Sequence, residues 1–461
     1  MSRRRLGVLG IAWDTWRAGR AHGDAIARRQ QARLAELVSH ARSASPYYRR
    51  LYRGLPPRVT DSRLLPRVDK RDLMEHFDQW VTDPEITLEG LKRNFLSDLS
   101  LVGSPYLGRY HVFTTSGTTG DPAVLVHDAD SWAVLQVVAR RSELRLLARW
   151  SVLRTVLRHG LRAAALFATG GHFAGPVLVE SARRRSSFIA RRLRMFSVLR
   201  PLSELVQELN DFQPTVLEGY PSVIALLAAE QKAGRLRIHP FLAITTGENL
   251  SASARAEIET TLGCQIANRY AASEVPALAV QCADGSFHVN VDWYLFEPVD
   301  EDHRPVPAGV TSHTVLVTNL ANRVQPVIRY DLGDRAEVTV APCACGSPLP
   351  AVKVEGRTGE ALPFESPDGH MVTVLPLALG AVIEETPGVR RFQAIRAGPR
   401  RLSVRLEIWP DAEPADVWKA VHERLDRFLA AHGAETVSIE HAREAPGADA
   451  RSGKFRQVWS A

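Results

Sequence analysis

The segment from Thr114 to Pro122 is rich in hydroxyls and reads Thr-Thr-Ser-Gly-Thr-Thr-Gly-Asp-Pro. Its two glycines leave backbone N–H groups able to close on an anion, and its five hydroxyls supply donors that could wrap the phosphates of a nucleotide. The segment lacks the Lys-Ser/Thr ending of the usual phosphate-binding loop, so a flexible Ser/Thr/Gly loop is the alternative.

Two further segments carry carboxylates. In Tyr270-Ala271-Ala272-Ser273-Glu274, after an expected strand, the carboxylate beside hydroxyls could hold Mg²⁺ against nucleotide phosphates. In Arg329-Tyr330-Asp331-Leu332-Gly333-Asp334, a carboxylate on a tight glycine turn could accept both hydroxyls of a ribose. Taken alone, the first is more often a surface glutamate, and the second is more often a plain β-turn.

Two basic segments lie near the end of the chain. Gly356-Arg357-Thr358-Gly359-Glu360 stands at an expected linker, and Ser452-Gly453-Lys454-Phe455-Arg456 is almost the last motif. A lysine in a glycine-containing loop is usually exposed to solvent without a task. What these two basic segments indicate depends on the order and spacing of all five segments.

The cysteines are Cys264, Cys282, Cys343 and Cys345. In a cytoplasmic chain of this size they do not form a disulfide framework. Cys343-Ala344-Cys345, together with Cys282 and His288, could give a Cys₃His tetrahedral zinc site that joins two hairpins away from the chemistry. Buried free thiols are the alternative, because Cys-x-Cys is less specific than Cys-x-x-Cys. We assign Cys264, next to an expected strand, to the core.

The elements that must position these segments follow from hydrophobic periodicity. Residues 25 to 100 show helical spacing broken by prolines. From about residue 110, short apolar runs alternate with helical patterns, which indicates parallel strands with crossover helices. Residues 286 to 340 read as hairpins. The clearest expected elements are strands at 163–168, 216–218, 242–246, 314–318, 402–408 and 436–440 and a helix at 414–431.

The expected fold class is therefore α/β, in three parts. Residues 1–100 are a helical lead-in to the large domain, residues 101–356 a body with mixed sheets and a β-rich subdomain, and residues 357–461 a small α+β C-terminal domain. A chain of 461 residues is long enough for at least two cores, and 45% apolar with 24% charged residues excludes general disorder.

The net charge of +7 comes mainly from arginine runs. These are not interleaved with aromatics, and no helix-turn-helix or zinc-finger spacing accompanies them, so we expect no nucleic-acid partner. No stretch approaches the roughly 20 apolar residues of a membrane span. Asp14 interrupts the short apolar N-terminal stretch, which argues against a secretory signal. We expect a cytoplasmic protein, and leave a homodimer and a peripheral membrane contact through the basic N-terminus as open alternatives.

In order and spacing, the five segments resemble the adenylate-forming (acyl-CoA synthetase-like) superfamily of acid ligases. The resemblance is to its phenylacetate-CoA ligase branch with CapK-like relatives, and it includes Ser45-Pro46-Tyr47-Tyr48-Arg49, a lead-in feature of that branch. It covers nearly the whole chain. Some relatives in this branch carry a Cys/His cluster comparable to the one above.

The resemblance implies roles for individual residues. The phosphate loop would be Thr115, Ser116, Gly117, Thr118, Thr119 and Gly120. The rest of the nucleotide site would be Gly247 and Glu248 at the adenine, Tyr270 and Ser273 beside it, Asp334 at the ribose and Arg357 at the hinge. Glu274 would carry Mg²⁺, and Lys454 would bridge the attacking carboxylate and the α-phosphate.

The acid itself would bind where strands end at the ligand edge of an α/β sheet. Gly170-Gly171-His172-Phe173 and Tyr220-Pro221-Ser222 both follow expected strands, so His172, Phe173 and Tyr220 are the candidates for this pocket. A hydrogen-bonded core histidine is the alternative for His172. The aromatic rings favour an aromatic or medium-length acid.

The activity implied is ATP-dependent formation of an acyl-adenylate, with transfer of the acyl group to a thiol, coenzyme A first. Relatives swing the C-terminal domain as a lid between two poses for the two half-reactions. Here Gly359 stands where many relatives have an acidic hinge residue, and Asp121 replaces a lysine common after the phosphate loop. An amine, hydroxyl or carrier thiol as acceptor is one alternative, and a non-catalytic nucleotide-binding scaffold is another. Retention of Lys454 argues against the scaffold.

Overall fold

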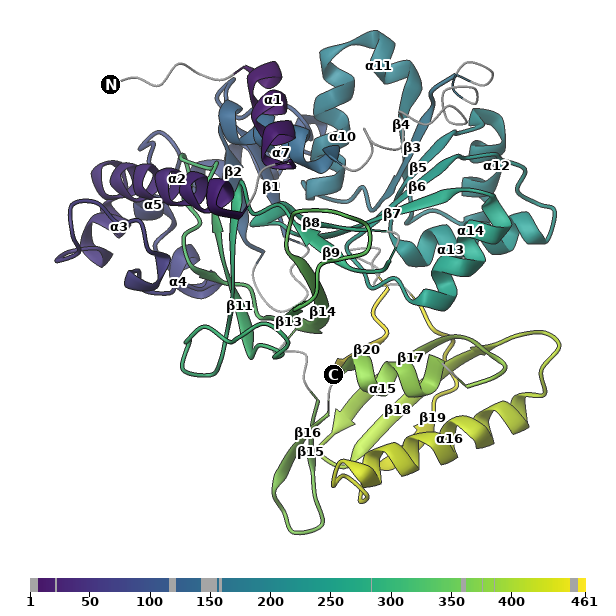
Figure 1. Cartoon of the computed structure of the whole chain (residues 1–461). Coiled ribbons are helices and arrows are strands. Elements are labelled where there is room, and N and C mark those ends of the chain that lie inside the picture. The colour runs from purple at the N-terminus through teal and green to yellow at the C-terminus, as the bar shows by residue number, and fades with distance from the viewer. Residues whose placement is uncertain are drawn as a thin grey trace.

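The computed structural model describes residues 7–20, 23–115, 122–141, 156, 160–282, 284–357, 362–374, 376–384, 386–447 and 455–461. Side chains are described over the same ranges apart from residues 355–357, 373, 376–378 and 381. Figure 1 shows a large body above and a smaller C-terminal unit below it. Within the described residues, no helix is long and apolar enough to cross a membrane.

The N-terminal part is helical, as its periodicity predicts. Its helices and short helical turns are α1 (Val8–Ala18), α2 (Gly23–Ala44), α3 (Pro46–Leu51), η1 (Ser62–Leu64), α4 (Lys70–Glu75), α5 (Phe77–Trp80), α6 (Leu88–Leu91), η2 (Lys92–Leu96) and η3 (Leu99–Leu101). Helix α3 begins at Pro46, and Ser45 Oγ caps it by accepting from Tyr48 N at 3.3 Å. The Tyr48 hydroxyl and the Trp80 indole both donate to the Pro326 carbonyl, at 2.9 and 2.6 Å. The lead-in thereby fixes the segment that precedes the Arg329–Asp334 motif.

The body is built on a large mixed sheet. Its strands are β3 (Ala163–Phe167), β4 (Leu193–Ser197), β5 (Val216–Gly219), β6 (Leu242–Thr246), β7 (Gln265–Ala272), β8 (Val275–Gln281), β9 (Phe287–Val289), β13 (Asp334–Val338) and β14 (Ala351–Arg357). Their spatial order is β13-β14-β9-β8-β7-β6-β5-β3-β4. The strands from β4 to β7 pair in parallel, as expected, and the direction reverses between β7 and β8.

Crossover helices and two small sheets complete the body. The helices are α7 (Ala129–Ala139), α10 (Ala174–Arg185), α11 (Ser187–Arg192), α12 (Leu202–Phe212), α13 (Pro221–Lys232) and α14 (Ala252–Leu262). One small sheet joins β1 (His111–Thr114) to β2 (Val124–His127), and the other holds β10 (Tyr294–Val299), β11 (Thr314–Asn319) and β12 (Tyr330–Asp331). The hairpins expected after residue 286 are thus present.

The body has two main apolar cores, and β7 runs from one to the other. Ile266 belongs to the core around β3, β5 and α13, which also buries Cys264 as predicted. Tyr270 and Ala272, further along the strand, pack against the core that the helical lead-in shares with β8 and β11. The far end of β7 therefore lies where the two cores meet.

The C-terminal unit has its own sheets and core. Its elements are β15 (Leu362–Glu365), β16 (Met371–Val374), α15 (Pro376–Glu384), β17 (Val389–Gly398), β18 (Arg401–Ile408), α16 (Pro414–Ala431), β19 (Ser438–His441) and β20 (Val458–Ser460). Strands β19-β18-β17-β20 form a mixed sheet, and α16 packs Val421, Leu425 and Leu429 into the core. The predicted helix at 414–431 coincides with α16. The domain boundaries at 100 and 356 stay predictions.

Candidate active site

Two of the predicted nucleotide-site residues meet at the far end of β7. The Tyr270 hydroxyl donates to the Asp334 carboxylate, although the two residues are 64 positions apart. Asp334 begins β13 directly after Gly333, whose φ of +73° is easily adopted only by glycine. Asp334 is 5% exposed, so its carboxylate is held in a buried position by sheet and turn together.

The other acid of this motif has a different task. Asp331 Oδ1 accepts from Thr314 Oγ1 at 2.5 Å and from the Gly333 backbone N–H at 3.1 Å. Such bonds from an aspartate to a residue two positions on stabilise the turn. Asp331 therefore shapes the loop that presents Asp334.

Glu274 lies in the turn between β7 and β8, next to the half-buried Ser273. Its side chain is 8% exposed, and its Oε1 accepts from the Tyr330 hydroxyl at 2.8 Å. Asn319 Nδ2 donates to the Glu274 carbonyl at 3.2 Å and fixes the turn. The Glu274 carboxylate, which the sequence predicts beside hydroxyls, thus lies beside the hydroxyl of Tyr330. Tyr330 belongs to the Arg329–Asp334 motif, and the sequence assigned it no role.

A further carboxylate, that of Glu248, follows the C-terminal end of β6. The chain leaves β6 through Gly247, whose φ is +83°. Glu248 Oε2 then accepts from the Ser222 backbone N–H at 3.1 Å, and Oε1 accepts from the Phe455 backbone N–H at 2.5 Å. The carboxylate therefore joins the start of α13 to the C-terminal segment, and the adenine contact predicted for Gly247 and Glu248 stays a prediction.

The most C-terminal motif is brought to this end of β6 by further contacts. The Phe455 ring lies 4.5 Å from the guanidinium of Arg391, a residue of β17. Burial lowers the pKa of Arg391, and the carboxylates of Glu407 and Glu248 oppose that shift. Neither Arg391 nor the Phe455 backbone was singled out from the sequence, because a cation over a ring has no periodic signature.

Several predicted residues lie outside the described part of the structure. These are Ser116, Gly117, Thr118, Thr119, Gly120 and Lys454, together with the departures Asp121 and Gly359 and the side chain of Arg357. The described base of the phosphate loop is a hairpin in which Thr114 pairs with Val124. Thr115 Oγ1 accepts from the Ala123 N–H at 2.8 Å. Strands β1 and β2 thus hold both ends of the loop.

The predicted acyl-pocket residues are mostly engaged with protein. His172 is 2% exposed, its Nε2 lies 3.0 Å from the Asp98 carbonyl, and burial lowers its pKa. This geometry favours the core-histidine alternative. Phe173 is half-buried at the start of α10. Tyr220 is buried, and its ring lies edge-on to that of Phe167. Burial raises the pKa of Tyr220, and the nearby Glu248 charge adds to that shift.

The four residues of the proposed zinc site gather in one place. The ligand atoms of Cys282, His288, Cys343 and Cys345 all lie within 4.8 Å of one another. Cys282 Sγ is 3.6 Å from Cys343 Sγ, and Cys345 Sγ is 3.1 Å from His288 Nε2. The other ring nitrogen, His288 Nδ1, lies 2.9 Å from the Leu349 carbonyl. Pairing of β9 with β8 and β14 brings these distant segments together.

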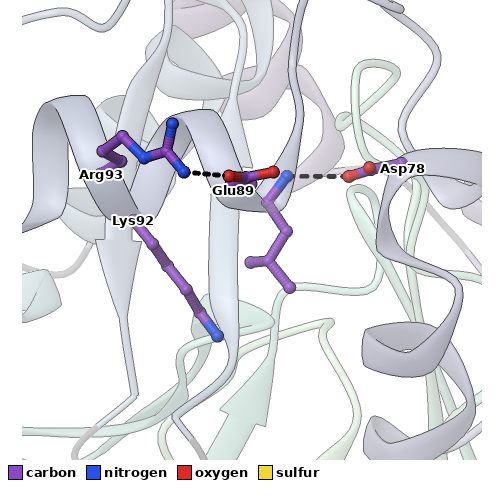
Figure 2. A pocket seen from close by; sticks show the side chains of 5 residues that line it. Asp78, Glu89, Lys92 and Arg93 are labelled. Carbon is purple, nitrogen blue, oxygen red and sulfur yellow. Dashed lines mark hydrogen bonds and ion pairs between the residues drawn. The ribbon is translucent and has the colours of Figure 1, made fainter.

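A separate surface hollow of about 590 Å³ lies by α5, α6 and η2. Figure 2 shows Glu89 paired with Arg93 and the Leu88 backbone N–H donating to Asp78, while the Lys92 side chain points elsewhere. None of the predicted site residues lines it, and the charges of Glu89 and Arg93 pair with each other.

Comparison with known proteins shows which sequences and structures the chain resembles. No family model matches the chain. Protein CapK of Staphylococcus aureus is 27% identical over 139 residues, which span 30% of this chain and 29% of that protein. Among solved structures, 2-hydroxyisobutyryl-CoA ligase in its postadenylation state has a TM-score of 0.65 at 20% identity, covering 95% of this chain and 89% of that one. The same ligase in its thioesterification state gives a TM-score of 0.53 at equal identity and coverage.

The chain therefore has the fold of the adenylate-forming enzymes, which confirms the resemblance that the ordered motifs predicted. More narrowly, it is a distant homologue of CapK, and the match reaches less than a third of that protein's length.

Proposed function

We propose that the protein activates a carboxylic acid with ATP as an acyl-adenylate and then passes the acyl group to a thiol, coenzyme A first. The observation that carries this proposal is the contact between Glu248 and the Phe455 N–H, which joins positions 207 residues apart. This contact brings Phe455, the residue after Lys454, to the C-terminal end of β6. The same body presents Asp334 and Glu274 at the end of β7.

The chemistry explains why these groups are needed. In the first half-reaction, a carboxylate oxygen of the acid attacks the α-phosphorus, and the bond from that phosphorus to the bridging oxygen breaks to release pyrophosphate. Two anions must approach each other, so cations that neutralise the growing charge lower the barrier. Lys454 and Arg357 are the cations proposed for this task, and Asp334 is proposed to hold the ribose.

Glu274 is proposed to hold Mg²⁺. Its buried carboxylate, oriented by Tyr330, fits a hard cation that prefers one or two carboxylates together with substrate phosphates. When bound, the ion supplies charge neutralisation at the phosphates.

The second half-reaction needs an acceptor. A thiolate sulfur attacks the acyl carbon, and the bond from that carbon to the AMP oxygen breaks to release AMP. The fold shared with 2-hydroxyisobutyryl-CoA ligase supports coenzyme A. An amine, a hydroxyl or a carrier thiol is the second candidate, because Gly359 departs from the acidic hinge residue of many relatives.

We infer that the structure represents the adenylation side of the cycle. The higher TM-score with the postadenylation state than with the thioesterification state, 0.65 against 0.53, supports this assignment. So does the Phe455–Glu248 contact, which joins the residue after Lys454 to the body.

The cysteine cluster is proposed to bind a structural zinc ion. In a tetrahedral site with bonds of about 2.3 Å to sulfur, ligand atoms lie roughly 3.8 Å apart. The observed atoms, within 4.8 Å of one another, need only small shifts to reach that geometry. The Leu349 carbonyl at His288 Nδ1 is the outer partner that orients a metal-binding imidazole.

The test is to incubate purified protein with ATP, Mg²⁺ and a panel of aryl and alkyl acids, and to measure pyrophosphate and AMP release with and without coenzyme A. Lys454→Ala should abolish acid-dependent pyrophosphate release. Lys419→Ala, an exposed lysine of α16, is the matched control and should leave it unchanged. Equal pyrophosphate release by wild type and Lys454→Ala would contradict the assignment. Silence across the panel would favour the scaffold.

A further inference from the structure

Helix α1 has two apolar faces, and only one of them is covered. Ile11, Thr15 and Ala18 are buried against the body. Leu9, Trp13 and Trp16 are 86%, 60% and 50% exposed. Spacings of four and three residues place these three side chains on one stripe of the helix. Large exposed aromatic side chains on a single stripe indicate a surface that meets another apolar phase.

The two tryptophans of the stripe are ordered together with a cation. Their rings stack with centroids 4.9 Å apart. The guanidinium of Arg20 lies 3.9 Å from the Trp16 ring centroid, and Arg17 is exposed at the same end of the helix. The stripe therefore ends in positive charge.

The covered side fixes the helix firmly to the body. The Trp293 indole donates to Thr15 Oγ1 at 3.1 Å, and Arg141 Nη2 donates to the Thr15 carbonyl at 3.3 Å. Asp14 pairs with Arg29 and Arg33 at 3.1 and 2.5 Å. The exposed stripe is thus part of a fixed surface, and the one carboxylate of α1 is neutralised on the protein side.

A second basic segment lies at the same end of the molecule. Figure 1 shows α1, α10 and α11 together at the top, and both α1 and α10 reach α7: α1 packs on it, and Arg185 Nη1 donates to Gln136 Oε1 at 3.2 Å. Phe188 of α11 is 60% exposed, and the Arg192 guanidinium lies 3.8 Å from its ring. The exposed arginines of α10 and α11 are Arg184, Arg185, Arg191 and Arg192, and none of them forms an ion pair with a described carboxylate.

We propose that this end of the protein, made of the α1 stripe and the α10–α11 arginines, docks onto the surface of an anionic lipid bilayer. Tryptophans favour the membrane–water interface, and an apolar stripe flanked by cations binds in the plane of that interface. Unpaired arginines gain most from anionic headgroups. A second copy of the chain would set these like charges against each other, which disfavours self-association through this face.

The proposal is independent of acid activation, because none of its residues belongs to the candidate active site. The experiment is flotation of the full chain with vesicles of phosphatidylcholine alone and of phosphatidylcholine mixed with phosphatidylglycerol, at low and high salt. Wild type should float with the anionic vesicles, and high salt should weaken binding. Trp13→Ser combined with Trp16→Ser should lower the partition coefficient by about tenfold or more. Arg17→Gln combined with Arg20→Gln should lower it roughly fivefold per arginine on anionic vesicles only.

The matched control is Leu64→Ser combined with Val340→Ser, two apolar residues that are 53% and 74% exposed elsewhere on the molecule. This variant should bind vesicles like wild type. Circular dichroism and acid-dependent pyrophosphate release, where present, report whether each variant is folded. The idea fails if wild type does not float, if it binds both kinds of vesicle equally, or if the tryptophan variant binds unchanged. A lipid-free dimer that the tryptophan substitutions dissociate would also overturn it, in favour of a protein interface.

Discussion

Tyr270 and Asp334 show how the site depends on single polar contacts. The phenol donates to a carboxylate that is 5% exposed, so the bond forms where water competes poorly. A hydrogen bond to a charged group contributes about 1.5–3 kcal/mol in such settings. Under the proposed function, it holds the carboxylate in the position where a ribose would meet it.

Removing that hydroxyl tests the assignment. Tyr270→Phe should weaken ATP binding roughly tenfold, because the Asp334 carboxylate loses a donor that orients it. Isothermal titration with ATP measures the change. Tyr52→Phe is the control, since the buried Tyr52 hydroxyl has no hydrogen-bond partner among the described residues and its loss should be nearly neutral. Equal ATP affinity in wild type and Tyr270→Phe would remove Asp334 from the proposed role.

Two neighbouring histidines predict a pH dependence of stability. Burial lowers the pKa of His127 to about 3, and burial with the Arg185 charge lowers the pKa of His111 to about 4. Both folded pKa values lie below the unfolded value, so the unfolded chain binds more protons as the pH falls below about 6.5. The stability that neutral His127 contributes is therefore present above that pH. Between pH 6.5 and 5 about 2 kcal/mol of it should be lost.

Urea unfolding followed by tryptophan fluorescence at several pH values measures this loss. Trp132 is a suitable probe, because its ring stacks on His111 at 4.0 Å and lies edge-on to His127 at 6.2 Å. His127→Gln should roughly halve the loss of stability between pH 6.5 and 5, since glutamine does not titrate and His111 still does. An unchanged slope in that variant would show that other groups cause it.

At the scale of elements, the cysteine cluster ties the β8–β9 hairpin to the turn before β14. If zinc is bound there as proposed, a chelator should lower the unfolding temperature, because the metal closes a loop of some sixty residues that contains β10 to β13. Thermal unfolding with and without chelator, together with zinc analysis of the purified protein, measures this. Cys345→Ser should lose the metal, and Cys264→Ala, in the core, should keep it. A zinc-free wild type that chelator does not affect would leave the cluster as free thiols.

Elements with a local signature were predictable from the sequence. Helix α16 and strand β6 have the predicted bounds, because apolar spacing and flanking prolines are properties of neighbouring residues. The site contacts were not predictable in this way. Glu248 meets Phe455 across 207 positions, and Glu274 meets Tyr330 across 56. Such pairs arise from the order of strands in the sheet, which periodicity does not specify. Likewise, no pattern separates a buried His172 from one that lines a pocket.

At the scale of the whole molecule, polar contacts between described residues join the C-terminal unit to the body. Lys232 of α13 lies 5.4 Å from the Trp409 ring, and Ser253 of α14 donates to Glu384 at 3.1 Å. On the body, these contacts and the Phe455–Glu248 bond involve α13, α14 and the loop after β6. Polar contacts of this kind suit parts that separate and meet again.

If this pose is the adenylating one, weakening the contact should slow the first half-reaction. Trp409→Ala removes a cation–π contact worth about 0.5–1 kcal/mol and should reduce acid-dependent pyrophosphate release roughly threefold to fivefold. Trp418→Ala is the matched control, because that ring stacks on His441 at 4.5 Å and packs against the core of the C-terminal unit. Equal losses in the two variants would assign the effect to destabilisation of the unit.

The course of β7 has a consequence for how activity returns after denaturation. Its Ile266 end belongs to one core, and its Tyr270 and Ala272 end packs against the other. Glu274 and Asp334 therefore take their places only when both halves of the body have folded and joined. Large chains commonly refold through intermediates in which one region is native first. Each such intermediate would regain helical signal while remaining unable to bind nucleotide, so recovery of ATP binding should lag behind recovery of secondary structure.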